Sequence, residues 1–195
     1  MRTGIFTTAL MASMLLVSAA YAASDPATEK LLKSTSDHTK FKALQQEFNS
    51  GPEVTKACLS CHTEASKQIH KTQHWKWEYT SPEGQLLGKK NVINNFCTSV
   101  ASNEAACNIC HVGYGWKDDK FDFKSEVNVD CLVCHDTTGN YRKPAGLAGN
   151  VVTKPMEFPP GSGNIVKPID LKQIAQAVGR TSRDNCGACH FYGGG

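Results

Sequence analysis

Apolar positions form one continuous run at the amino terminus and only short, interrupted groups after it. The run from Ile5 to Val17 follows the positive charge of Arg2 and leads to Ala20-Tyr21-Ala22, a small-x-small pattern typical of signal-peptide cleavage. It is too short for a transmembrane helix. The pattern therefore predicts a signal peptide over residues 1–22 and an exported chain from residue 23 onward.

Beyond the signal, the spacing of apolar residues and helix breakers predicts short helices joined by long irregular segments. We expect helices over 24–32, 38–48 and 62–79, and another from Asp170 to Val178 that Asp170 caps and Gly179 ends. Ser81-Pro82-Glu83-Gly84 predicts a turn, and 113–123 and 141–163 are expected to be irregular. The fold class predicted is mainly α with extensive irregular loops.

Cysteine usage changes this picture, because eight of the nine cysteines fall into Cys-x-x-Cys pairs, each followed directly by histidine. The motifs are Cys58, Cys61 and His62; Cys107, Cys110 and His111; Cys131, Cys134 and His135; and Cys186, Cys189 and His190. Two thiols at this spacing can add to the vinyl groups of one haem, and the next imidazole can ligate its iron. Zinc knuckles would not need a histidine after every pair, and a disulfide framework would scatter its cysteines. The sequence predicts four covalently bound haem c groups.

Composition supports a core built from haem. Leu, Ile, Val and Phe are sparse for the number of haems, so we expect the chain to wrap around a haem-packed core and to fold poorly without haem. Basic and acidic residues are nearly balanced, 21 against 18, which argues against a nucleic-acid partner.

Three histidines outside the motifs, His38, His70 and His74, are candidate distal ligands. His70 and His74 are four residues apart, so on a helix they would share a face and could reach two neighbouring haems. The alternative is a solvated polar face. Three histidines cannot serve four irons. At least one iron is therefore expected to have an open position, another ligand type or a ligand from outside this sequence. An open position is what an enzyme requires.

The ninth cysteine, Cys97, leaves three interpretations open. It is a small buried apolar residue, a disulfide partner of a cysteine outside this sequence, or a thiol beside an open haem where it meets a sulfur substrate.

Several long strings resemble the octahaem tetrathionate reductase family of c-type cytochromes. They are Asn91-Val-Ile-Asn-Asn-Phe-Cys97, Cys110-His-Val-Gly-Tyr-Gly-Trp-Lys-Asp118, Asn128-Val-Asp-Cys-Leu-Val-Cys-His-Asp-Thr-Thr-Gly139 and Asn185-Cys-Gly-Ala-Cys-His-Phe-Tyr-Gly-Gly-Gly195. The resemblance implies a periplasmic protein with eight haems, of which residues 23–195 are a four-haem portion truncated at its carboxyl end. It also implies redox partner proteins or a membrane quinol-linked cytochrome.

The same resemblance implies the two-electron cleavage of tetrathionate, a small sulfur oxyanion, to two thiosulfates. The second haem, at Cys107, Cys110 and His111, would be catalytic, and the family's Asn-x-x-Cys matches Asn94 and Cys97. The lysine that ligates this haem in the family is expected beyond Gly195. Two alternatives are a four-haem electron-transfer cytochrome without its own catalysis and a multihaem nitrite or hydroxylamine oxidoreductase.

Overall fold

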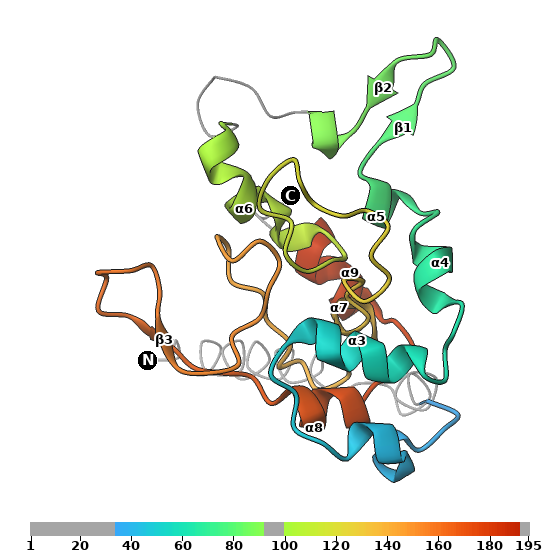
Figure 1. Ribbon diagram of the computed structural model, residues 1–195, viewed down its shortest axis with the longest axis vertical. Helices are drawn as coiled ribbons and strands as arrows, with labels where there is room; N and C mark the ends of the chain where they lie inside the picture. Colours follow the sequence, from blue (N-terminus) through green and yellow to red (C-terminus); the bar gives the residue numbers. More distant parts are fainter. Residues whose placement is uncertain (1–33, 92–99, 192–195) are drawn as a thin grey trace, which may run out of the picture. The chain divides into compact units, whose positions relative to one another are not determined.

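The computed structural model describes residues 34–91 and 100–191, in which short helices alternate with long irregular segments (Figure 1). The α-helices are α3 (Gly51–Leu59), α4 (Ala65–Ile69), α5 (Gln73–Lys76), α6 (Glu104–Cys107), α7 (Leu132–His135), α8 (Leu171–Gln176) and α9 (Arg183–His190). The 3₁₀ turns are η1 (His38–Lys40), η2 (Lys42–Leu44), η3 (Lys89–Asn91), η5 (Ala101–Asn103) and η6 (Asn108–Cys110). The signal peptide over 1–22 and the helix expected over 24–32 lie outside the described residues.

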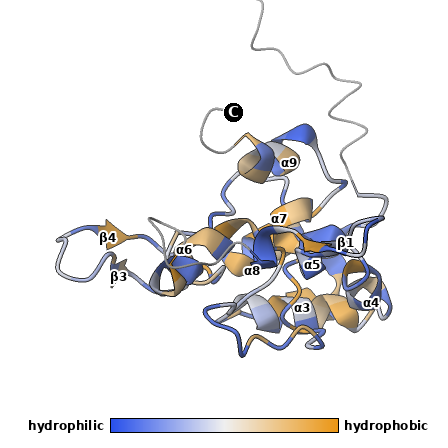
Figure 2. Ribbon diagram, turned by 90° about the horizontal axis from the view of Figure 1, so that it is seen from above, coloured by the Kyte–Doolittle hydropathy of each residue, from blue (hydrophilic) through white to orange (hydrophobic). Residues whose placement is uncertain are grey.

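Two small antiparallel hairpins accompany the helices. Strand β1 (Tyr79–Thr80) pairs with β2 (Leu86–Leu87), and β3 (Met156–Glu157) pairs with β4 (Ile165–Val166). The predicted turn at 81–84 joins the first pair, with the Gly84 N–H donating to the Ser81 carbonyl at 2.9 Å and Gly84 at φ +82°. The sequence prediction had not included these strands. In Figure 2 the β3–β4 hairpin extends away from the helices, and its Ile165 is 62% exposed.

The main core lies where α3 packs beside α8 (Figure 1). Helix α3 begins at Ser50, whose hydroxyl accepts the Glu53 N–H, and Pro52 in the first turn has a φ suited to a helix start. The core side chains are Leu44, Phe48, Val54, Leu132, Tyr141, Leu171, Ile174 and Ala175. Burying each large aliphatic side chain contributes about 1.5–3 kcal/mol. This cluster therefore joins segments from both ends and the middle of the described chain.

A second cluster surrounds Trp75, which packs with Val112 and Val129 and against Phe121 and Phe123. The Trp75 indole N–H donates to the Phe123 carbonyl at 2.9 Å. The segment 113–123 is irregular, as predicted, and its aromatic side chains supply one wall of this cluster.

Two of the predicted helices are wrong in extent. Over 38–48 the chain makes only the turns η1 and η2, because Phe41 adopts an extended conformation between them. Over 62–79 the chain forms α4 and α5 in place of one helix, because Thr72 is extended and Trp77 is left-handed at φ 50°. His70 therefore caps α4 while His74 lies in α5, so the shared helix face is also wrong.

The fold class is confirmed in its coarser form, with mostly helices and irregular segments plus small sheets. The helix α8 agrees with its prediction, and Asp170 caps it by accepting the Gln173 N–H at 2.8 Å. Among the described residues, no helix is long and apolar enough to cross a membrane. The haem-packed core stays a prediction.

Candidate haem-binding site

All four Cys-x-x-Cys-His motifs lie within or at the end of helical turns. The first follows from the end of α3, the second spans α6 and η6, the third includes α7, and the fourth lies inside α9. In a helical turn, residues i, i+3 and i+4 share one face. The thiols and imidazole of a motif therefore start from one side of the backbone, as two thioether bonds and one axial ligand to a single haem require.

Two distal candidates lie opposite motif histidines. The ring centres of His38 and His62 are 6.4 Å apart with ring planes 23° apart, and those of His74 and His190 are 6.1 Å apart with planes at 83°. An imidazole nitrogen bonds a metal at about 2.0 Å and lies about 1.15 Å from its ring centre, so two imidazoles on opposite sides of one iron have centres about 6.3 Å apart. The first and fourth motifs therefore fit a haem iron held between two histidines.

Hydrogen bonds at Nδ1 orient the imidazoles of His38 and His135. His38 Nδ1 lies 3.2 Å from the Ser36 carbonyl, and His135 Nδ1 lies 2.8 Å from the Gly179 carbonyl. A histidine that donates from Nδ1 to a carbonyl presents Nε2 to a metal. In residues 34–91 and 100–191, no group of three or more His, Cys, Asp or Glu side chains is arranged to hold a bare metal ion.

The third motif is tied to the fourth through the backbone. Asp136, directly after His135, accepts the Asn185 amide on its carbonyl at 2.9 Å, and α7 packs beside α9. Asn185 also completes the capping box of α9 with Ser182. The oriented His135 imidazole fits a haem ligand.

His70 stacks on Trp75 with ring centres 4.5 Å apart, and its buried Nε2 has no hydrogen-bond partner among the described residues.

In the second motif the imidazole is engaged within the protein. The His111 side chain is fully buried, its Nε2 lies 2.8 Å from the Trp75 carbonyl, and its Nδ1 has no partner among the described residues. Burial lowers the pKa of His111 to about 4, so the ring is neutral. Aromatic rings surround it, with centres 4.7 Å away for Trp116, 5.1 Å for Trp75, 5.3 Å for Trp77 and 5.4 Å for Phe121. The nitrogen that would meet iron is engaged with the Trp75 carbonyl, and ligation by His111 stays a prediction.

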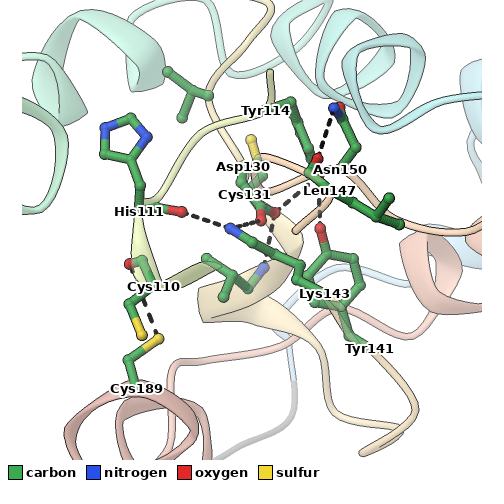
Figure 3. Close-up of polar contacts among 12 residues, drawn as sticks. Cys110, His111, Tyr114, Asp130, Cys131, Tyr141, Lys143, Leu147, Asn150 and Cys189 are labelled. Carbon is green, nitrogen blue, oxygen red and sulfur yellow. Dashed lines mark hydrogen bonds and ion pairs between the residues drawn. The ribbon is translucent and has the colours of Figure 1, made fainter. Parts of the chain in front are cut away.

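Thiols of different motifs lie next to one another. The Cys189 thiol lies 4.0 Å from the Cys110 carbonyl oxygen (Figure 3). The proximity of the Cys189 thiol lowers the pKa of the Cys110 thiol to about 6, and the same proximity, together with burial, raises the pKa of Cys189. Cys58 and Cys131 form the same kind of pair, which lowers the pKa of Cys58 and raises that of Cys131. The first motif is therefore adjacent to the third, and the second to the fourth.

A buried polar network lies between the second and third motifs and contacts both. Lys143 lies between the His111 carbonyl and the Asp130 carboxylate, and the hydroxyls of Tyr114 and Tyr141 extend the network (Figure 3). Burial, followed by the charge of Asp130, raises the pKa values of both tyrosine hydroxyls well above the usual range for tyrosine. The amino-acid sequence alone does not predict this network, because nothing in it indicates that a single lysine in an irregular segment is buried.

Asn94 and Cys97, the residues predicted to act on substrate, lie outside the described residues, which resume at 100. Two lysines at the near edge of that gap cover the aromatic cluster. Lys89 Nζ lies 5.4 Å from the Trp77 ring centre, and Lys90 Nζ lies 4.9 Å from that of Phe123.

Comparison with known proteins gives one informative match. No family model and no curated protein sequence matches this chain. The chain is similar to the crystal structure of octaheme cytochrome c from Shewanella oneidensis, at 46% sequence identity and a TM-score of 0.66 over 81% of its own length. It covers 33% of that structure's chain, so it spans about a third of the octaheme protein.

The match agrees with the local geometry. The matched protein is an octaheme cytochrome c, and the facing histidines and helical Cys-x-x-Cys-His turns are what haem attachment needs. Taken together, the motifs, the spacing of the histidines and the similarity support a multihaem c-type cytochrome.

Proposed function

We propose that this chain binds haem c at its four motifs and passes electrons among these haems. The spacing of His38 from His62 and of His74 from His190 carries the proposal, because both separations match two imidazoles bound to one iron. When bound, haem supplies one-electron transfer at iron. The protein's own contribution is to attach each haem through two thiols, orient its axial imidazole and set its surroundings.

The contacts between thiols of different motifs support transfer from haem to haem. Each thioether bond lies at the edge of its haem. The Cys58–Cys131 and Cys110–Cys189 contacts therefore support neighbouring haem edges for the first and third motifs and for the second and fourth.

The test of attachment is a mass measurement. The chain, expressed with a c-type maturation system and then denatured, should keep its colour and carry the mass of four haems. A Cys58→Ser, Cys61→Ser variant should lose the mass of one haem, while Lys56→Ala on the same helix should lose none. An apoprotein mass for the wild type would overturn the proposal.

For the full-length protein that contains this segment, we propose tetrathionate as the substrate. The support is the family resemblance of the strings around Asn94 and Cys97, together with the 46% identity to an octaheme cytochrome c. Tetrathionate accepts two electrons, its central sulfur–sulfur bond breaks, and two thiosulfates leave. A thiolate at Cys97 could hold a sulfane sulfur by thiol–disulfide exchange, and Asn94 could donate hydrogen bonds to a sulfonate oxygen.

This proposal is tested with electrons from a low-potential dye. The full-length protein should reduce tetrathionate, and Cys97→Ala should cut turnover steeply while its low-spin haem spectrum stays unchanged. Cys97→Ser is the matched control for side-chain size, and it should be as impaired as Cys97→Ala. Unchanged kinetics in both variants would return Cys97 to a packing role.

Electron transfer without catalysis is a second candidate, and the facing histidine pairs favour it. An iron held between two histidines has no free position for a substrate, which suits a pure carrier. The two candidates differ in turnover. A carrier should exchange electrons with the dye and reduce neither tetrathionate nor nitrite, and should not oxidise hydroxylamine. Turnover of a nitrogen compound alone would instead favour the multihaem nitrite or hydroxylamine oxidoreductases.

A further inference from the structure

Lys143 and Asp130 form an ion pair that water barely reaches. Their side chains are 3% and 0% exposed, and Lys143 Nζ lies 3.1 Å from Asp130 Oδ2. Every other ion pair recorded for the described residues leaves each partner at least 25% exposed. Since removing charges from water is costly, such a pair persists only where its surroundings hold it in place.

Each partner also contacts a different haem-attachment motif. Lys143 Nζ donates to the carbonyl of His111, in the second motif, at 2.5 Å. Asp130 directly precedes Cys131, and its Oδ1 accepts the Val133 N–H at 3.0 Å in the first turn of α7, which carries the third motif. The ion pair therefore links the two motifs through side chains whose positions are fixed.

The remaining contacts show how strongly the carboxylate is held. Asp130 Oδ1 also accepts the Tyr114 hydroxyl at 2.8 Å, and that hydroxyl lies 2.9 Å from the Tyr141 hydroxyl. Asp130 Oδ2 faces Lys143, and no hydrogen bond of good geometry forms at this oxygen among the described residues. The carboxylate charge is thus balanced chiefly by one cation, Lys143.

We propose that Lys143 and Asp130 are positioning residues that fix the second motif against the third and, as a balanced charge pair, set the reduction potential of the haem on the third motif. The proposal rests on the haem attachment proposed above. Buried charges act through a medium of low dielectric, and nearby charge is one of the factors by which a protein tunes haem. An unbalanced carboxylate favours the more positive, oxidised haem, and an unbalanced ammonium favours the reduced haem.

The two single variants should shift the haem reduction potential in opposite directions. Lys143→Met removes the cation at similar length and leaves the carboxylate, so one haem should shift to a lower potential. Asp130→Asn leaves the ammonium, so the same haem should shift to a higher potential. The double variant should return close to the wild-type value. Tyr114→Phe removes one hydrogen bond from the carboxylate without changing charge, and it should give a smaller shift in the direction of Lys143→Met.

The experiment is a redox titration of each holoprotein, monitored by electron paramagnetic resonance so that individual low-spin haems are resolved. Lys172→Met is the control, because it breaks the exposed pair with Glu47 and should leave every potential unchanged. A purely structural role would lower the melting temperature of both single variants without opposite shifts. The proposal is overturned if Asp130→Asn does not raise the potential, or if neither Lys143→Met nor Tyr114→Phe lowers it. Haem counts by mass, taken first, separate this outcome from a failure of haem attachment.

Discussion

Replacing His74 by alanine should convert one haem from low spin to high spin. The ring centres of His74 and His190 are 6.1 Å apart, close to the roughly 6.3 Å expected for two imidazoles that share an iron. An alanine methyl ends several ångströms short of that iron and offers no donor atom, so only water could take the position. His74 is exposed in the short helix α5, so its truncation leaves no buried cavity, and the fourth motif still attaches the haem. The spectral change should therefore occur without unfolding.

The assay is the loss of one haem equivalent of low-spin signal, measured by electron paramagnetic resonance or visible spectroscopy. Lys76→Ala, on the same helix, is the matched control and should stay fully low spin. Added imidazole should restore the low-spin signal of the His74 variant, because the vacated position is open to solvent. His38→Ala should give the equivalent change at the first motif.

A variant that lacks the fourth haem tests whether His74 and His190 share one iron. In a protein that lacks the fourth haem through Cys186→Ser and Cys189→Ser, His74→Ala should add no further high-spin signal, whereas His38→Ala still should. A fully low-spin spectrum for His74→Ala in the otherwise wild-type chain would refute the geometric reasoning.

Two further changes test the scaffold. Ser182→Ala removes the capping box of α9 and should cost about 1 kcal/mol of unfolding free energy by chemical denaturation, with Ser162→Ala as the surface control. Thr55→Val should cost about 1–3 kcal/mol in the same assay, because it leaves the buried Val129 carbonyl, now 2.6 Å from the threonine hydroxyl, without its donor.

Sequence patterns predicted the local features that depend on neighbouring residues. The cap of α8 by Asp170 and the turn at 81–84, where the Ser81 hydroxyl accepts the Gln85 N–H, both involve side chains that bond to the adjacent backbone. The helix expected over 62–79 failed because of a distant contact. Trp75 is buried against segment 113–123, and its indole bonds to the Phe123 carbonyl, which favours the break at Thr72 over a continuous helix.

In the candidate site, too, local features could be predicted and those that depend on distant contacts could not. The Cys-x-x-Cys-His spacing is a local pattern, so every attachment motif could be found in the sequence. The pairing of each distal histidine with a motif could not be predicted, because His74 and His190 approach each other only through the fold. The burial of Lys143 was also invisible, since lysines are mostly exposed and its partner Asp130 lies in another segment.

The packing of α3 on α8 imposes an order on assembly. A chain is made and emerges from its amino end, so the first motif is available long before α8 exists. Val54, on the helix that carries Cys58, reaches full burial only when Leu171 and Ile174 arrive. Until then α3 packs only against segments made earlier, such as η2, and the side that α8 covers stays open. Haem attachment at the first motif can thus precede folding, and the last part of the described chain then closes over a helix that is already modified.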